Sequence, residues 1–405
     1  MILPRRVLGA PGTPSPNERV AIGQIGVGGM GTAHIRSGIA DHLVAICDVD
    51  GEFLARTSEA LGDHVATYTD YRHILDRQDV DAVLIAAPDH WHALMTIHAC
   101  EAGKDVYCEK PANRTIEEGQ KMIAAARRYG RIVQVGAQGR STPGGYHACK
   151  YIRNGGIGEV KHVAIWHELN YSGGDPALFQ NPPEHLDWDM WLGPARMRPY
   201  HPECVHFNFR WLMDFGGGFV RDRGAHIISL AQWFLDLDQT YPTKITATGQ
   251  MQTEGVWDIP LAMDAKFEYA DGLVIDWHQS DKDGWPSEHP YGAVYHGSDG
   301  DLMVTGGDGF TRAEQKAVDF EIPAGGFEPL LAEDHRYHWL ECVKTRTRPN
   351  LDIEIGVRTV NVCNLANISY LLGRPLEWDG ENERVIGDEQ ANLMLSEPGR
   401  GEWQI

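Results

Sequence analysis

The stretch that decides the fold is VAIGQIGVGGMG, residues 20–31, an apolar run that leads into a Gly-x-Gly-x-x-Gly turn. The glycines permit a tight turn, a close approach of the backbone to a pyrophosphate, and close packing of a helix on a strand. The next segment has helical character, so the N-terminus of its helix would face the phosphates. Asp48 ends the next apolar run, where a carboxylate accepts from both ribose hydroxyls and repels a 2′-phosphate. We therefore predict a dinucleotide site that favours NAD over NADP, held by Gly26, Gly28, Gly29, Met30, Gly31 and Asp48.

Short apolar runs alternate with amphipathic segments from residue 19 to about residue 136. One of these segments, Thr115–Tyr129, opens with a Thr-x-x-Glu capping box, which is typical of a helix start. Strands joined by helices of this length form right-handed crossovers and a parallel sheet. We predict an N-terminal Rossmann domain with a doubly wound parallel sheet, whose strands are Val20–Ile25, Leu43–Asp48, Ala82–Ala87, Asp105–Cys108 and Ile132–Val135.

The pattern changes after about residue 140. Later runs come in pairs that flank the Asp-Gly dipeptides at 271–272 and 299–300, which is the strongest short-range signal for a β-hairpin. We predict a C-terminal α/β domain with a large, mostly antiparallel open sheet. Its predicted strands are Val160–Asn170, Ala262–Tyr269, Leu273–Gln279, Gly292–His296 and Asp301–Thr305, and its helices are Gly145–Asn154, Leu331–Thr345 and Glu354–Leu371.

The chain is thus expected to divide into an extended arm (1–18), a dinucleotide-binding domain (19–140), a second α/β domain (141–372) and a tail that packs back on the body (373–405). The arm contains Arg5 and Arg6, but no apolar segment follows them, so it is not an export signal as it stands. Its sequence is compatible with the mature start of an exported protein. The sequence therefore leaves a cytoplasmic and a bacterial periplasmic location open.

Composition excludes several classes of partner. The 36 Lys and Arg residues against 57 Asp and Glu residues give a net charge of 36 − 57 = −21, which repels nucleic acids and anionic membranes. No run of about 18 apolar residues is present to span a bilayer. The seven cysteines are scattered, without Cys-x-x-Cys or Cys/His finger spacing. We expect no nucleic-acid or membrane partner, no disulfide framework and no metal site.

Two motifs follow predicted strands at the edge where parallel sheets bind ligands. PDHWH (88–92) comes after the third predicted strand, and CEKP (108–111) ends the fourth. A lysine at this edge projects into the cofactor crevice, and the proline after it stops the strand. The predicted cofactor contacts from these motifs are Pro88, His90, His92, Glu109 and Lys110.

With the segment from Asp222 to His226 (DRGAH) and the stretch DWDMWLGPA at 187–195, these motifs resemble the glucose–fructose oxidoreductase/inositol dehydrogenase (Gfo/Idh/MocA) family from about Val20 to Trp403. The resemblance implies a second domain whose open sheet often mediates oligomerisation, hence a homo-oligomer (dimer or tetramer). It also implies NAD(P)-dependent oxidation or reduction of sugars and cyclitols, with a catalytic set that maps onto Lys110, Asp222 and His226. One position departs: Ser229 stands where many relatives carry an acidic residue.

Oxidation of a secondary alcohol requires a hydride acceptor, a proton acceptor and a cation beside the developing alkoxide. The imidazole of His226, with an ordinary pKa of about 6.5, is suited to take the proton. A helix through this segment would place Asp222 and His226 on one face, where the carboxylate orients the imidazole. Lys110, from the other domain, would hold the reacting oxygen.

All tryptophans except Trp91 lie beyond residue 140, and sugars stack their apolar faces on such rings. The predicted substrate contacts are Arg140, Tyr146, His167, Tyr171, His206, Trp211 and Arg221.

The leading functional hypothesis is a dehydrogenase of a neutral sugar, glycoside or cyclitol. The alternative is an NAD-dependent, redox-neutral glycosidase, which oxidises the sugar transiently, eliminates the aglycone and reduces again, and which needs an additional acid/base. A non-enzymatic NAD-sensing role is a third hypothesis.

Overall fold

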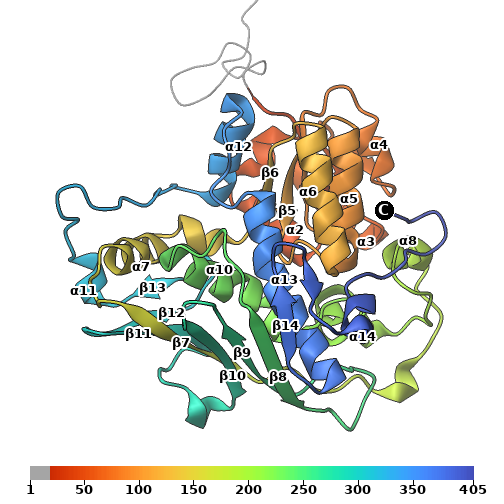
Figure 1. Cartoon of the computed structure of the whole chain (residues 1–405). Helices are drawn as coiled ribbons and strands as arrows, with labels where there is room; N and C mark the ends of the chain where they lie inside the picture. The colour runs from red at the N-terminus through yellow and green to blue at the C-terminus, as the bar shows by residue number, and fades with distance from the viewer. Residues whose placement is uncertain (1–18) are drawn as a thin grey trace, which may run out of the picture.

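The computed structural model describes residues 19–405 and arranges them around two sheets (Figure 1). The predicted arm, residues 1–18, lies outside the described residues. The first sheet has six strands in the order β3-β2-β1-β4-β5-β6, and all its neighbouring strands run parallel. The predicted doubly wound parallel sheet is therefore confirmed. Its strands are β1 (Ile22–Ile25), β2 (Leu43–Cys47), β3 (Ala66–Tyr68), β4 (Ala82–Ile85), β5 (Asp105–Glu109) and β6 (Val133–Gly136).

The helices of this half lie between the strands in sequence. Helix α6 begins with the expected capping box, in which the Thr115 side chain accepts from the backbone N–H of Glu118 and the Glu118 side chain bonds back. Strand β3 was not predicted, because three half-exposed residues carry too short a pattern to be recognised. The helices are α2 (Gly29–Arg36), α3 (Gly51–Leu61), α4 (Arg72–Leu75), α5 (Asp89–Glu101) and α6 (Ile116–Arg128).

The second sheet has nine strands in the order β13-β12-β11-β7-β10-β9-β8-β14-β15. It is mostly antiparallel, as predicted, and the pair β7–β10 runs parallel. Both Asp-Gly hairpins are present, as β9–β10 and β11–β12. The strands are β7 (Val160–Glu168), β8 (Lys244–Gln250), β9 (Ala262–Glu268), β10 (Val274–Ser280), β11 (Tyr291–Gly297), β12 (Gly300–Thr305), β13 (Arg312–Ala313), β14 (Leu376–Asp379) and β15 (Arg384–Val385).

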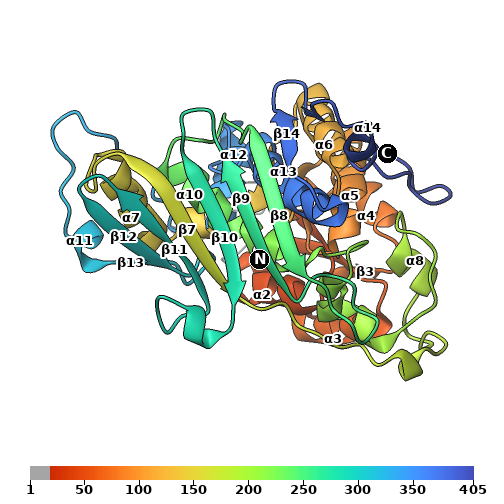
Figure 2. The same cartoon turned by 60° about the horizontal axis from the view of Figure 1, so that its bottom comes forward.

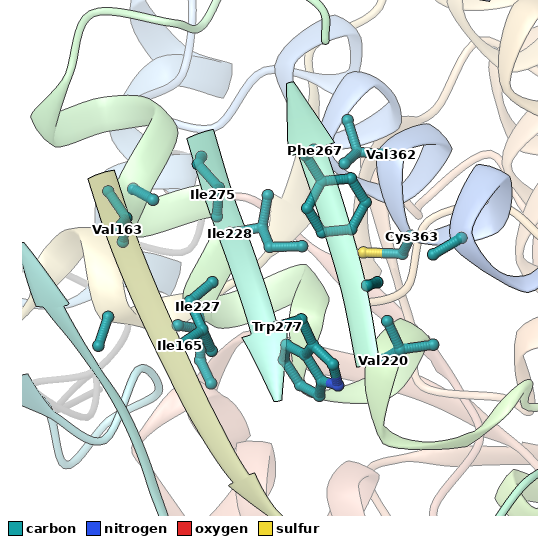
Figure 3. Close-up of a cluster of buried hydrophobic side chains, with 14 of the residues drawn as sticks. Val163, Ile165, Val220, Ile227, Ile228, Phe267, Ile275, Trp277, Val362 and Cys363 are labelled. Carbon is teal, nitrogen blue, oxygen red and sulfur yellow. The ribbon is translucent and has the colours of Figure 1, made fainter. Parts of the chain in front are cut away.

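Helices cover one face of this sheet and leave the other face open (Figure 2). Ile227 and Ile228 of α10 and Val362 of α13 pack against Ile275 and Trp277 of β10 in one buried cluster (Figure 3). Within residues 19–405, no helix combines the length and the hydropathy that a bilayer span requires. The helices of this half are α7 (Pro143–Arg153), α8 (Trp188–Leu192), α9 (Gly218–Asp222), α10 (Gly224–Phe234), α11 (Gln315–Val318), α12 (His335–Thr345), α13 (Ile353–Leu372) and α14 (Glu389–Leu393).

Helix α13 belongs to both cores. Its first half buries Ile353 and Val357 with the core of the six-stranded sheet, and its second half buries Val362 with the core of the nine-stranded sheet. A Cβ at Gly356 would lie 2.4 Å from a side-chain carbon of Val135, so only glycine permits this close approach to β6. The helix therefore fixes the two sheets relative to each other, which positions the site between them (Figure 1).

The C-terminal segment returns to the first half of the chain. Trp403 is 5% exposed and lies edge-on to Trp91 of α5, with ring centroids 5.1 Å apart. The Arg72 guanidinium covers the Trp403 ring at 4.8 Å. The last residues therefore complete the core of the dinucleotide-binding half.

Removal of the Trp403 ring tests this packing. Trp403→Ala should lower the free energy of unfolding by about 3 kcal/mol, because a buried indole and its contacts are lost. The measurement is urea denaturation followed by circular dichroism. Leu393→Ala is the matched control: Leu393 is 78% exposed in the same tail, so its truncation should change stability by no more than about 0.5 kcal/mol. Equal stability of the Trp403→Ala variant and the wild type would contradict the assignment.

Candidate active site

A cavity of about 1040 Å³ lies where β1, β2, β4 and β5 end. Its other wall comes from segments of the second half, including α9, the start of α10 and the loop after β12. The cavity brings together the three predicted catalytic residues, Lys110, Asp222 and His226. The predicted cofactor residues that line it are Gly26, Gly28, Gly29, Met30, Asp48, Pro88, His92, Glu109 and Lys110.

The glycine turn has a steric reason at two positions, Gly26 and Gly31. Gly26 has φ +88°, and a Cβ there would lie 2.5 Å from the Ala86 carbonyl oxygen. A Cβ at Gly31 would lie 2.1 Å from the carbonyl oxygen of Gly26, so Gly31 serves the packing of α2 and does not line the cavity. At Gly29 a Cβ would meet nothing within 4 Å, which leaves open space at the N-terminus of α2. The buried Gln24 amide braces the turn by donating to the carbonyl oxygens of Gly26 (3.0 Å) and Gly31 (2.9 Å).

Asp48 follows β2 and borders the same cavity. Its Oδ2 accepts from the Val27 N–H at 2.8 Å, and its Oδ1 accepts from the Asp50 N–H at 2.9 Å. Burial raises the pKa of Asp48 to about 6, although these hydrogen bonds lower it. Each carboxylate oxygen keeps a second acceptor position, which suits a ribose diol. The open turn, the helix N-terminus and this carboxylate together fit a dinucleotide.

The central contact of the site joins its two walls. Lys110 Nζ lies 2.6 Å from Asp222 Oδ1 and also donates to the Asp222 carbonyl oxygen at 3.0 Å. The Lys110 side chain is 11% exposed and that of Asp222 is 7% exposed. Arg210 Nε lies 3.2 Å from the same Oδ1, and Arg223 Nε lies 3.9 Å from Oδ2. Burial alone would raise the pKa of Asp222, but the three cations hold it far below its ordinary value.

His226 stands in the first turn of α10 and is 5% exposed. Its Nδ1 is buried and has no hydrogen-bond partner among the described residues. Burial and the charge of Lys110 lower its pKa to about 3, so the imidazole is neutral at pH 7. The expectation that Asp222 orients this imidazole is wrong. The chain forms two helices that meet at Arg223, and the Asp222 carboxylate bonds Lys110 instead.

Two buried side chains brace the loop that carries Lys110. Glu109 accepts from His34 Nε2 of α2 at 2.7 Å and from Gln138 Nε2 at 2.8 Å, so it links the glycine-turn helix to the lysine loop. His92 places Nδ1 2.7 Å from the Pro111 carbonyl oxygen and Nε2 2.8 Å from that of Ala87.

Because carbonyl oxygens only accept, both His92 ring nitrogens carry hydrogens and the ring is an imidazolium. Burial lowers the pKa of His92, but the neighbouring Cys108, Asp89 and the Pro111 carbonyl raise it to about 10. The imidazolium therefore ties the end of β4 to the lysine loop.

Another predicted cofactor residue has a different place. His90 is buried, and its Nε2 lies 2.9 Å from the carbonyl oxygen of Trp191 in α8. Its ring also packs on Phe215. It does not line the cavity, because its contacts join α5 to the second half.

The predicted substrate contact Arg140 is a structural residue. Its guanidinium forms a bidentate pair with Asp238 at 2.6 and 2.8 Å, and its Nε donates to Ser229 Oγ at 2.9 Å. The side chain is 1% exposed and does not line the cavity. The Ser229 hydroxyl, at the position where many relatives carry an acidic residue, therefore accepts a hydrogen bond from Arg140.

Most of the other predicted substrate contacts also lie outside the cavity. His167 is buried and stacks on Trp277 and Tyr291, and Tyr171 packs on the fully buried Trp211. The remaining two are engaged elsewhere: the Tyr146 hydroxyl bonds Glu328, and the buried Arg221 donates to the Gly216 carbonyl oxygen at 2.8 Å.

Only His206 among the predicted substrate contacts lines the cavity. It packs on Phe53 with ring centroids 4.7 Å apart, and its Nε2 lies 3.5 Å from Asp50 Oδ2. This is the Asp48 end of the cavity, where a nucleoside would lie, so His206 is placed for the cofactor more than for the substrate.

Sequence reasoning missed several residues of the site. The loop GGDGF at 306–310 had a visible signal, since glycines surround a lone acidic residue directly after a strand. Within residues 19–405, no three or more His, Cys, Asp or Glu side chains are grouped so as to hold a metal ion. The cavity residues that were not predicted include Ser141, Phe207, Arg210, Arg223, Asp308, Phe310 and His335.

Comparison with known proteins agrees with this arrangement. Residues 20–137 match the model of an oxidoreductase family, the NAD-binding Rossmann fold of Gfo/Idh/MocA proteins, and residues 160–405 match its C-terminal alpha/beta domain. The chain belongs to the Gfo/Idh/MocA oxidoreductase family. It therefore has the NAD-binding domain of that family, in agreement with the predicted cofactor.

Three curated relatives show the range of named activities. Levoglucosan dehydrogenase of Pseudarthrobacter phenanthrenivorans is 34% identical over 154 residues, 35% of this chain and 39% of that protein. Inositol 2-dehydrogenase of Salmonella typhimurium is 24% identical over 288 residues, 66% of this chain and 82% of that protein. Glycosyl hydrolase family 109 protein 1 of Shewanella sp. is 31% identical over 169 residues, 38% of this chain and 36% of that protein. The match thus spans well under two thirds of the first and third relatives.

Solved structures share the fold. The WlbA dehydrogenase from Bordetella pertussis, in complex with NADH and UDP-GlcNAcA, has a TM-score of 0.66 at 19% identity, over 89% of this chain and 98% of that one. A levoglucosan dehydrogenase in complex with NADH and L-sorbose has a TM-score of 0.63 at 20% identity, over 89% and 98%.

The raised pKa of Asp48 predicts that NADH binding depends on pH. Protonation removes the charge and an acceptor for the ribose, so affinity should fall as the pH decreases through about 6 and be about tenfold weaker at pH 5 than at pH 7.5. Fluorescence titration with NADH measures the dissociation constant.

Asp48→Asn should bind NADH weakly at every pH, and it should discriminate less between NADH and NADPH. The exposed Asp41→Asn is the control. Constant affinity of the wild type from pH 7.5 to pH 5 would contradict this role.

Proposed function

We propose that the protein is an NAD-dependent dehydrogenase that transfers a hydride between the nicotinamide and a secondary hydroxyl of a neutral sugar, glycoside or cyclitol. The observation that carries the proposal is the meeting of Lys110 and His226, from the two halves of the chain, in the wall of the dinucleotide-sized cavity. The relatives named as inositol and levoglucosan dehydrogenases support this class of substrate.

The cofactor, when bound, supplies the hydride acceptor. Lys110 holds the reacting oxygen through its ammonium group, and Asp222 fixes the position of that group. His226 is neutral and is placed to take the hydroxyl proton. The charge of Lys110 opposes protonation of His226, so proton transfer is favoured once the developing alkoxide offsets that charge.

The charges of the cavity support a neutral, polyhydroxylated substrate. Three cations, Lys110, Arg210 and Arg223, lie at the reacting end. Asp222 and Asp308 lie among them and pair with them at 2.6 to 3.2 Å. These charged groups offer donors and acceptors to hydroxyl groups, and their pairing with the two carboxylates offsets most of the positive charge that would otherwise favour an anion.

The redox-neutral glycosidase stays the alternative. The relative named as a glycosyl hydrolase favours it, and so does the additional carboxylate Asp308, which provides an acid/base group beyond Lys110 and His226. Release of sugar from an aryl glycoside without net NADH would decide for this function.

We extend the proposal to a homo-oligomer that associates through the open face of the nine-stranded sheet (Figure 2). Ala164, Val294 and Met303 lie directly opposite one another across β7, β11 and β12 and are half-buried on that face. His162 and His296 form a second, stacked row beside them.

Val294→Glu should weaken this association, because it places a charge in the apolar row. Sedimentation velocity of the wild type should give a dimer or tetramer of the 45.1 kDa chain, and the variant should shift toward the monomer. Lys161→Glu, a charge change at an exposed position of β7, is the control. A monomeric wild type would exclude the interface.

The catalytic proposal predicts separate losses of chemistry and of binding. With myo-inositol, levoglucosan, D-glucose and 4-nitrophenyl β-D-glucoside as probes, the wild type should form NADH with at least one polyol, seen by absorbance and product chromatography. Lys110→Met should lower kcat by about 10²- to 10³-fold and His226→Ala by about 10²-fold, because each removes a group that acts on the reacting oxygen or its proton.

Both variants should still bind NADH, and the exposed Lys282→Met variant should keep the wild-type rate. Unchanged rates in Lys110→Met and His226→Ala would contradict the mechanism and favour an NAD-sensing role.

A further inference from the structure

We infer that Asp308 is a second substrate-binding carboxylate of this site, which accepts a hydrogen bond from a hydroxyl next to the reacting carbinol and so selects vicinal diols. This inference rests on the proposed function and names the substrate chemistry that the site requires. Asp308 comes from the loop that follows β12, far in sequence from Lys110 and Asp222.

The glycines of this loop explain how Asp308 reaches the site. A Cβ at Gly307 would lie 2.8 Å from a side-chain carbon of Ile227, the residue after His226. A Cβ at Gly139 would lie 2.2 Å from the Gly307 carbonyl oxygen. Only a residue without a side chain permits the loop to cross so close to the first turn of α10. The crossing places Asp308 in the cavity wall with His226.

The Asp308 carboxylate is held on several sides. Its Oδ2 accepts from Arg223 Nη1 at 2.8 Å and from the Tyr291 hydroxyl at 2.9 Å, and its Oδ1 accepts from the Phe310 N–H at 3.0 Å. The Arg223 guanidinium also covers the Tyr291 ring at 4.9 Å. With four acceptor positions and three donors, one position on Oδ1 is left for a ligand. The side chain keeps 18% exposure.

The position that carries an acidic residue in many relatives supports this role. In this chain it is Ser229, which is 1% exposed and accepts from Arg140 Nε, outside the cavity. The α10 helix therefore supplies no second carboxylate to the substrate. Asp308 supplies one from another element, and its charge acts on the same imidazole, because Asp308 raises the pKa of His226 while Lys110 and Arg223 lower it.

Asp308→Asn tests the inference, because the amide keeps the shape of the side chain and removes its charge. With whichever of myo-inositol, levoglucosan or D-glucose the wild type oxidises, the KM of the variant should rise by about 10- to 100-fold. The dissociation constant for NADH should be unchanged. An analogue that lacks the hydroxyl next to the oxidised carbon should react poorly with the wild type, and Asp308→Asn should impair it little further.

The control is Asp301→Asn, the same change in the strand that precedes the loop, at an exposed carboxylate that pairs with His296 outside the cavity. It should keep the wild-type KM. Asp308→Glu provides a second variant if Asp308→Asn fails to fold: it keeps the charge for Arg223 but displaces the carboxylate, so its KM should also rise.

A wild-type KM in Asp308→Asn would overturn the inference. So would equal losses with the polyol and with its deoxy analogue, which would show that Asp308 serves only to hold Arg223 and Tyr291. A wild-type enzyme that oxidises none of the polyols would instead reject the proposed function, and with it the inference.

Discussion

The ion pair between Lys110 and Asp222 is the contact on which the site depends. It joins the loop after β5 to the end of α9, so it exists only when the two halves of the chain are in register. Both groups are largely removed from water, and two further cations surround the carboxylate. Loss of either partner would leave an uncompensated buried charge, which is far more unfavourable than the pair itself is favourable. Helix α13, buried in both cores, holds the two halves in the relative position that the pair requires.

The same burial assigns different protonation states to neighbouring groups. Asp222 stays ionised because three cations face it, whereas burial and the charge of Lys110 keep His226 neutral, and no carboxylate among the described residues accepts a hydrogen bond from its Nδ1. A pair of groups whose pKa values are driven apart in this way can divide the work of orienting and of proton transfer. The interpretation of Asp222 and His226 as one helical dyad did not foresee these separate roles. Spacing within a helix does not show which side chain of another segment will contact the carboxylate, here Lys110.

Local patterns predicted the architecture well and the far wall of the site poorly. The glycine turn, the capping box and the Asp-Gly hairpins are each decided by a few adjacent residues, and all are present. Arg140 was expected at the substrate because it follows the last Rossmann strand, but it pairs with Asp238, a partner that no spacing rule could identify. Asp308 was missed for the converse reason: its place depends on the close crossing of Gly307 over Ile227, a contact between distant segments.

The glycine-turn helix, the end of β4 and the loop that carries Lys110 are also joined to one another by buried polar contacts. Glu109 bonds His34, which lies in the helix after the glycine turn, and the doubly bonded His92 imidazolium holds the carbonyls of Ala87 and Pro111. Any shift of the lysine loop would therefore break hydrogen bonds to the glycine-turn helix and to the end of β4, and buried polar groups are expensive to leave unpaired. The lysine loop and the glycine-turn helix are for this reason held in one arrangement by buried hydrogen bonds. The residues beside the glycine turn therefore help to fix the position of Lys110 in the cavity wall.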